Sequence, residues 1–357
     1  MTARDEFETL TPEFGVHING SEKSIDAITA DLISLQVLDD VDAMSMFALS
    51  ISAWNSAESK VKWIDDELFQ EGNPVKITMG YHNHLETLFS GEITALEPYF
   101  PEGRTPILTV RGYDRRHRLM RQRKTRSYTN LKDSAIANQL ATQATLQAET
   151  EDTGVVLPYV LQHNQTDYDF LIGRARLIGY ELVINDRTLL FRPRKIQEEA
   201  TLTLRRDIEL LEFRPRMTTM SQIEEFTVRG WNPKEKKEIV ARSSAGEEPR
   251  KMGGTVSGPA NVRERFSGTG GTRVTMPVQS QDEADQLAKQ ALSEVALDYI
   301  RAEGLCIGDP RLRAGTVVNV EGIGVRFSGP YYVCSADHRF SMSKGYRTAI
   351  FARRNAT

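Results

Sequence analysis

The chain has 357 residues, a formal net charge of −4 and a hydrophobic share of 39%. These values indicate a folded, soluble protein of about two or three domains, with no global electrostatic preference for nucleic acid or for a membrane. No apolar run approaches the roughly 20 residues that cross a bilayer. The polar stretch Met1–Glu8 lacks the apolar core of a signal peptide, and Cys306 and Cys334 fit a reducing compartment, so we expect synthesis and folding in a cytoplasm.

Residues 1–120 are predicted to be mostly β. Leu35–Leu38 and Met46–Ile51 are short apolar strands that flank the acidic turn Asp39–Asp42. Pro74–Met79 alternates apolar and polar residues with period two, which is typical of a half-buried strand.

A compact α+β insert is predicted over residues 121–200. Apolar spacing between Asn130 and Gln147 suits a short helix. Thr166 followed by Asp169 resembles a capping box, and Gly179 is a natural end for the helix that follows it. Two strands joined by a tight turn come next and predict a hairpin.

The last third of the chain combines a predicted loop, a helix and further strands. Residues 243–272 are rich in Gly, Ser, Pro and charge and lack periodicity, so we expect an exposed loop. Ser280 and Glu283 form a capping box at the start of a long amphipathic helix, for which Gly304 is the predicted C-cap. Gly-bounded strands follow to the end of the chain.

One string of residues occurs twice in the chain. Leu108–Asp114 returns as Phe226–Asn232, and the strand-like pieces Ile93–Glu97 and Ile208–Glu212 lie upstream of the two copies. This pattern predicts two copies of one β unit, an arrangement typical of proteins in quasi-symmetric assemblies. The candidate interface or structural residues are those of the two strings and the start of the basic run after the first: Arg111, Gly112, Tyr113, Arg115, Arg116, Arg118, Arg229, Gly230 and Trp231.

Seven Arg or Lys residues lie between Arg115 and Arg126. A dense basic run can be an electrostatic footprint for nucleic acid. Aromatic residues do not interleave this run and the whole chain is mildly acidic, which favours a solvated patch or a contact surface for an acidic protein neighbour. Nucleic-acid binding by this segment is kept as the alternative function.

Catalytic and metal-binding motifs are weak. The sequence has no nucleophile elbow of the Gly-x-Ser-x-Gly type. His82 and His84 could share one strand face, but no third ligand has a suitable spacing, which favours a solvated surface over a metal site. We therefore predict no enzymatic activity, no cofactor and no metal.

Seven stretches carry a resemblance to a known family and span most of the chain in order. They are Phe89–Pro98, Leu108–Leu119, Tyr159–Asp167, Phe170–Tyr180, Phe213–Arg216, Val228–Lys234 and Gly308–Pro310. In these stretches the chain resembles the phage late control D family, the baseplate hub proteins of contractile phage tails and contractile injection systems. The same module forms the N-terminal part of VgrG-like spike proteins.

The resemblance implies a mainly β fold with two duplicated tail-tube-like β-barrel domains, a small α+β domain and a loop-helix insertion. The first barrel is expected at 1–120 and the α+β insert at 121–200. The second barrel is expected at 201–241 and 305–357, interrupted by the loop and long helix at 242–304. Three such chains would form a ring of six tube-like units that matches a hexameric inner tube on one side and a trimeric spike on the other.

The partners implied by the resemblance are two further copies of this chain in a homotrimer, the inner tube protein, other baseplate proteins and the tape measure. The chain ends soon after the second predicted barrel, so we expect the spike to be a separate protein. No membrane partner or cofactor is implied. The expected location is a virion or an extracellular injection particle.

Overall fold

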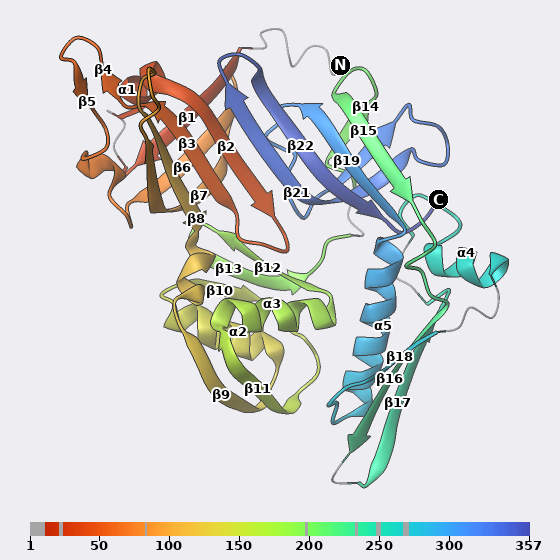
Figure 1. The fold of residues 1–357 in the computed structure, drawn as a ribbon. Coiled ribbons are helices and arrows are strands. Elements are labelled where there is room, and N and C mark those ends of the chain that lie inside the picture. The colour runs from red at the N-terminus through yellow and green to blue at the C-terminus, as the bar shows by residue number, and fades with distance from the viewer. Residues whose placement is uncertain are drawn as a thin grey trace. The chain divides into compact units, whose positions relative to one another are not determined.

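The computed structural model describes residues 11–20, 24–82, 84–196, 199–232, 235–247, 251–266 and 271–357 (Figure 1). The polar N-terminal stretch Met1–Glu8 lies outside these residues. The protein is mainly β, as the sequence predicts. None of the helices in the described part has the length and apolarity that a membrane crossing requires.

The chain divides into two compact units. Unit 1 contains Met1–His117, Leu305–Ala314 and Ser335–Ile350, and unit 2 contains the remaining segments, Arg118–Gly304, Gly315–Cys334 and Phe351–Thr357. Three strands contribute residues to both units: β19 Ile300–Ile307, β21 Gly329–Ser341 and β22 Gly345–Arg354. Unit 1 is therefore not a contiguous stretch of sequence.

Unit 1 is built on an antiparallel sheet with the order β1-β6-β7-β8-β3-β2-β21. Its strands are β1 Pro12–Ile18, β2 Leu32–Asp40, β3 Met46–Ser52, β6 Pro74–Tyr81, β7 His84–Tyr99, β8 Ile107–Asp114 and the Ser335–Ser341 part of β21. Smaller elements are helix α1 Ser24–Asp31, the short strands β4 Trp54–Asn55 and β5 Lys60–Val61, and the 3-10 turns η1 Glu67–Phe69 and η2 Arg115–Met120.

The core of unit 1 follows the predicted alternation. Val75, Ile77 and Met79 of β6 are buried, whereas Pro74, Lys76 and Thr78 are exposed or half-buried. They join Phe47 and other apolar side chains of β1, β2, β3, β7 and β8 in one hydrophobic cluster. Burial of each large apolar side chain contributes about 1.5–3 kcal/mol, so this cluster is the main source of stability of unit 1.

The first part of unit 2 is the predicted α+β insert. Its elements are β9 Arg123–Leu131, α2 Asp133–Gln143, β10 Gln147–Thr150, β11 Leu157–Thr166, α3 Asp167–Ile178, β12 Tyr180–Asn185 and β13 Thr188–Pro193. They form a three-stranded sheet of order β10-β13-β12 and a two-stranded sheet of β11 and β9. Thr166 caps α3 by accepting a hydrogen bond from the Asp169 amide, and Gly179 ends it in the left-handed region, as predicted.

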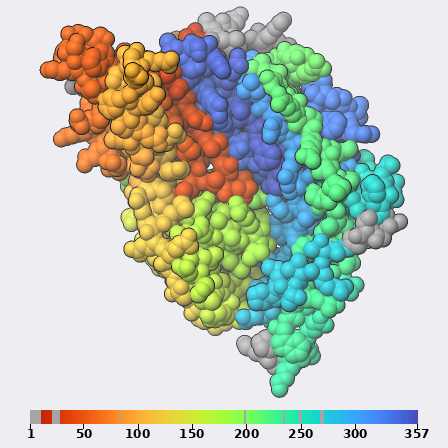
Figure 2. Space-filling view, in the orientation of Figure 1, coloured from red at the N-terminus to blue at the C-terminus, as the bar shows by residue number. Residues whose placement is uncertain are grey.

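The second part of unit 2 contains more strands and two helices. They are β14 Leu202–Arg205, β15 Leu210–Met217, β16 Glu225–Asn232, β17 Lys237–Ser244, α4 Gly258–Arg265, β18 Thr272–Thr275, α5 Gln281–Leu297 and β20 Val317–Glu321. β20 pairs with β14 and β21, and the order β22-β19-β15 continues from β21. β16 lies between β17 and β18 in a separate three-stranded sheet that packs on α5. Figure 2 shows the surface of the β16–β17 hairpin in green.

Two boundaries predicted from the sequence are wrong. Helix α5 begins at the predicted cap Ser280 but ends at Leu297, not near Gly304, because the period of burial changes from helical to alternating at Ile300, where β19 begins. Residues 243–272 are not only loop, because β17 extends to Ser244 and α4 spans Gly258–Arg265. Ser257 caps α4 by accepting from the Ala260 amide, a start signal that the sequence interpretation missed.

The two copies of the repeated string have different strand partners. The first copy of the repeated string is β8, which pairs with its upstream piece in β7. The second copy is β16, which pairs with β17 and β18, whereas β15, which begins at Leu210 within the upstream piece, lies beside β19. The two strings are both strands, but they have different neighbours.

Candidate functional site

The first copy of the repeated string places alternate side chains on opposite faces of β8. Arg111 is half-exposed, and its Nε lies 2.9 Å from both carboxylate oxygens of Glu97. Tyr113 is exposed, whereas Gly112 and Asp114 are buried. Arg111 and Tyr113 are therefore available for contacts with a partner, and Asp114 belongs to the interior.

Gly112 allows β7 and β8 to approach closely. A Cβ atom built at this position would overlap the backbone carbonyl oxygen of Glu92 and the ring of Phe47. The backbone oxygen is held by the sheet, so it cannot move aside without breaking strand pairing.

Replacement of Gly112 by Ala is expected to lower the free energy of unfolding by about 2–3 kcal/mol, because the added methyl group overpacks a fixed backbone contact. Gly173→Ala is the matched control: Gly173 lies in α3 with open space around its Cα, so this change should raise stability by about 0.5–1 kcal/mol. Urea unfolding of both variants measures the difference. Equal effects of the two substitutions would contradict the close approach at Gly112.

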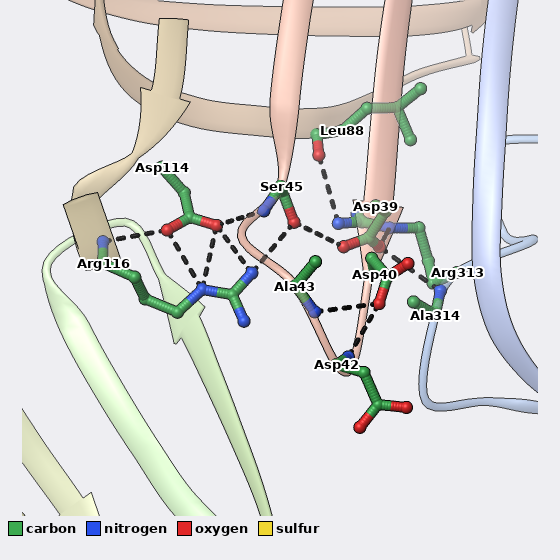
Figure 3. Close-up of polar contacts among 10 residues, drawn as sticks. All are labelled: Asp39, Asp40, Asp42, Ala43, Ser45, Leu88, Asp114, Arg116, Arg313 and Ala314. Carbon is green, nitrogen blue, oxygen red and sulfur yellow. Dashed lines mark hydrogen bonds and ion pairs between the residues drawn. The ribbon is translucent and has the colours of Figure 1, made fainter. Parts of the chain in front are cut away.

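A buried arginine–carboxylate cluster lies directly after β8 (Figure 3). Arg116, only 1% exposed, donates from Nε to both oxygens of Asp114 at 3.0 Å and from Nη2 to Oδ2 at 2.6 Å. Asp114 also accepts from the backbone amides of Arg116, at 2.8 Å, and Ser45, at 2.6 Å. The Asp114 carboxylate thus ties the end of β8 to the turn before β3.

Ser45 connects this cluster to a second ion pair, as Figure 3 shows. Its hydroxyl accepts from Arg116 Nη2 at 3.2 Å and donates to Asp39 Oδ1 at 2.9 Å. Arg313 donates from Nε to the other oxygen of Asp39 at 2.8 Å and from its terminal nitrogens to the carbonyl oxygens of Thr87 and Leu88, each at 3.1 Å. Burial alone would raise the pKa of Asp39, but the charge and hydrogen bond of Arg313 outweigh it and hold that pKa below its ordinary value.

The turn between β2 and β3 is fixed by Asp40. One carboxylate oxygen of Asp40 accepts from the amides of Asp42, at 2.7 Å, and Ala43, at 3.0 Å. Burial raises the pKa of Asp40 in spite of these hydrogen bonds. The acidic turn predicted from the sequence is therefore a structural part of the cluster.

The backbone just before Arg313 is fixed by a hydrogen bond between the carbonyl oxygen of Leu312 and the side chain of His338. The carbonyl oxygen of Leu312 lies 2.9 Å from His338 Nε2, which therefore carries the proton, and Nδ1 accepts from the hydroxyls of Tyr346, at 2.8 Å, and Thr348, at 3.1 Å. His338 is fully buried, and burial together with the nearby Arg313 charge lowers its pKa to about 4.

The stability of the protein is expected to fall as the pH drops from 6.5 to about 4, by about 3 kcal/mol from His338 alone. The sign follows because the unfolded chain binds a proton at His338 in this window and the folded chain does not. The contribution is complete above pH 6.5 and declines no further below about pH 4. The measurement is urea unfolding at a series of pH values, and in the variant His338→Gln this slope should disappear. An unchanged slope in the variant would contradict the assignment.

A second buried group surrounds Glu92. Arg115 Nε lies 3.2 Å from one carboxylate oxygen of Glu92, and His117 Nε2 lies 2.8 Å from the other. All three residues are buried. Glu92 thus fixes Arg115 and His117, the two neighbours of Arg116, while Asp114 fixes Arg116 itself.

The basic run is not a continuous exposed patch, which corrects the surface interpretation for its first two residues. Arg115 and Arg116 are buried on carboxylates, as described above. Farther along, Lys124 and Arg126 both contact Asp167, at 2.7 and 2.6 Å. Arg118 is half-buried in η2. Several of the charges that would form a nucleic-acid footprint are therefore paired within the chain.

The second copy of the repeated string lines a surface groove of about 760 Å³. It is lined by Arg229, Gly230, Trp231 and Glu238 and by the segment Thr275–Gln279. Trp231 is 57% exposed, and Arg229 forms an ion pair with Glu238 at 3.3 Å. All three predicted residues of this copy therefore lie in one groove.

In the ranges that the structure describes, no three His, Cys, Asp or Glu side chains are grouped as metal ligands would be. His82 is exposed and lies 2.8 Å from Glu13. The sequence interpretation missed Asp39, Ser45, Glu92 and Arg313, and only the acidic doublet at Asp39 could have drawn attention to one of them.

Two solved tail proteins share this fold. The 43 kDa tail protein of prophage MuSo2 from Shewanella oneidensis matches with a TM-score of 0.72 and 14% identity, over 96% of this chain and 98% of that chain. A tail protein from Neisseria meningitidis MC58 matches with a TM-score of 0.70 and 12% identity, over 96% of both chains.

A third match is the c3393 protein of E. coli, described as a component of the type VI secretion system with structural similarity to the phage T4 tail proteins gp27 and gp5. It has a TM-score of 0.58 and 14% identity, over 96% of this chain and 77% of that chain. At these identities the likeness shows a shared fold.

Sequence comparison gives a family. No curated protein matches the chain. The model of the family described as "Alg8 N-terminal domain" matches residues 8–341, nearly the whole sequence. The chain belongs to this family.

Proposed function

We propose that the protein is a structural baseplate hub of a contractile phage tail or injection system, in which three copies form a ring between a hexameric inner tube and a trimeric spike. The observation that carries this proposal is the fold shared with a phage tail protein over 96% of this chain and 98% of the other. The match to a type VI secretion component described as similar to phage tail proteins supports the same class of particle.

The ring would contain two tube-like units from each chain. The strands of unit 1 would supply the first, which was expected at residues 1–120, together with the Ser335–Ser341 part of β21. The second would combine β14, β15, β20 and parts of β19, β21 and β22, so β16 and β17 would lie outside the barrel predicted over 201–241 and 305–357. Edge strands of such units are natural sites of pairing with neighbours, and a closed ring covers them.

The candidate residues take two different roles in this proposal. The side chains of Arg111, Tyr113 and Trp231 are at least partly exposed, and they would contact partners. Gly112, Arg115 and Arg116 would act from the interior by fixing the end of β8.

The test is the absolute mass of the purified full chain by light scattering, over a range of concentrations and with the spike protein of the same particle added. A trimer of about three times 40.2 kDa, alone or with spike, is expected. A monomer under every condition, including with spike, would overturn the ring.

The alternative of nucleic-acid binding through Arg115–Arg126 is weakened by the carboxylate partners of Arg115, Arg116, Lys124 and Arg126. Binding to phosphates would give an affinity that falls steeply with salt concentration. Filter binding of the full chain to duplex DNA at several salt concentrations tests this, and we expect a slope near zero.

A further inference from the structure

Cys334 of β21 is buried in unit 2 beside the guanidinium of Arg353. Its Sγ accepts a hydrogen bond from Arg353 Nε at 3.1 Å, and the side chain is 5% exposed. Arg301 also interacts electrostatically with this sulfur. Cationic neighbours favour the thiolate, which is the reactive form of cysteine.

The other end of the Arg353 guanidinium, at Nη1, is fixed by two carboxylates. Nη1 donates to Glu294 at 2.6 Å and to Asp298 at 3.2 Å, and the residue is only 7% exposed. Burial alone would lower the pKa of Arg353, but the charges of Cys334 and Glu294 outweigh it and raise that pKa, so the guanidinium stays charged.

On the side of its guanidinium that faces Cys334, Arg353 uses only one of two hydrogen-bond donors. In an arginine side chain, Nε and Nη2 point their N–H groups in the same direction. Arg116 and Arg174 use this pair of donors together to bind both oxygens of Asp114 and Asp133. In Arg353, Nε meets a single sulfur atom, and the buried Nη2 has no hydrogen-bond partner among the described residues.

We propose that Cys334 is an oxidation site for peroxide, and that Arg353 binds the oxygen atoms of its oxidised sulfur. A sulfenate adds one oxygen to Sγ, and a sulfinate adds two and resembles a carboxylate in charge and shape. The oxygen would accept from Nη2 and give this donor the partner that it lacks, just as Asp114 does for Arg116. A buried donor without a partner is unfavourable, so the new hydrogen bond favours the oxidised state.

The reaction balances with hydrogen peroxide as the oxidant. The Cys334 thiolate attacks one peroxide oxygen, an S–O bond forms and the O–O bond breaks. Sulfur loses two electrons, and the leaving hydroxide takes a proton and departs as water. A second peroxide molecule converts the sulfenate to the sulfinate in the same way.

The experiment treats the folded full-length protein with hydrogen peroxide, traps sulfenate with dimedone and quantifies each cysteine peptide by mass spectrometry. Cys306 is buried and reduced in the same chain and serves as the internal control. Cys334 is expected to oxidise at least about tenfold faster than Cys306, because the guanidinium of Arg353 contacts its sulfur and favours the reactive thiolate. Equal rates in the folded protein would overturn the proposal.

Two variants separate the role of Arg353 from simple exposure. Arg353→Met removes both the charge and the paired donors, and Arg353→Lys keeps the charge without the pair. Both should slow the oxidation of Cys334, the first by about tenfold, and neither should change Cys306. If Arg353→Met does not fold, Arg353→Lys decides: oxidation of Cys334 as fast as in the unmodified protein would contradict the part assigned to Arg353.

Discussion

Replacement of Arg116 by Met is expected to lower the free energy of unfolding by about 3–5 kcal/mol, because it leaves the Asp114 carboxylate buried without its counter-charge. Asp114 would keep the amides of Ser45 and Arg116 as donors, but these do not supply a full positive charge. Ser45 would also lose the contact that joins it to Arg116. Urea unfolding measures the loss.

The matched control is Arg111→Met, which removes the same kind of side chain five positions earlier. The side chains of Arg111 and Glu97 are 38% and 53% exposed, so loss of their ion pair should lower the free energy of unfolding by less than about 1 kcal/mol. Adding Asp114→Asn to Arg116→Met should restore part of the lost stability, because the uncompensated charge is then gone. Similar losses of unfolding free energy for Arg111→Met and Arg116→Met would contradict a buried Asp114–Arg116 ion pair.

Replacement of Arg354 by Met is expected to cost about 4 kcal/mol or more and to loosen the segment around Met252. Arg354 is 1% exposed and donates to four carbonyl oxygens: Met252 at 3.0 Å, Gly253 at 3.2 Å, Phe327 at 3.1 Å and Ser328 at 2.8 Å. Each acceptor that loses its donor in the interior costs about 1–3 kcal/mol. Methionine fills a similar volume over the ring of Tyr331 but offers no donor.

Two measurements test the Arg354 substitution. Unfolding in urea gives the global loss, and hydrogen exchange should show faster exchange at the amides of Thr255 and Val256, which bond to the carbonyl oxygen of Thr357. Arg347→Met, at an exposed position of the same strand β22, should change neither. Protection of Thr255 and Val256 that survives Arg354→Met would contradict a role in fixing this segment.

Local signals in the sequence predict local structure well. Thr166, Gly179 and Ser280 mark helix ends through contacts with residues only three or four positions away, and all three lie where the caps were predicted. Alternation in Pro74–Met79 also predicts which side chains are buried, because the period of a strand is a property of a few neighbouring residues.

Strand partners and buried charges could not be predicted in the same way. The strings around Val110 and Val228 share the residues Thr-Val-Arg-Gly. Nevertheless β8 joins the sheet of unit 1 and β16 joins a hairpin on α5, because pairing depends on segments far away in the sequence. Arg115 and Arg116 look like surface charges until Glu92 and Asp114 are placed beside them. For Arg313 there was no local signal, since its partner Asp39 lies 274 positions earlier.

Because β2 pairs with β21, this part of the sheet can form only after both strands have been synthesised. Gln36 of β2 donates to Asp337 of β21, 301 positions later, so β2 leaves the ribosome long before its partner strand exists. At about 5–20 residues per second, the edge of β2 stays uncovered for roughly 15–60 seconds. During that time it is a template for wrong pairing, including pairing with another nascent copy of the same chain. Completion of unit 1 must therefore wait until β21 has been translated, and a chaperone that shields β2 in the interval would raise the yield of folded protein.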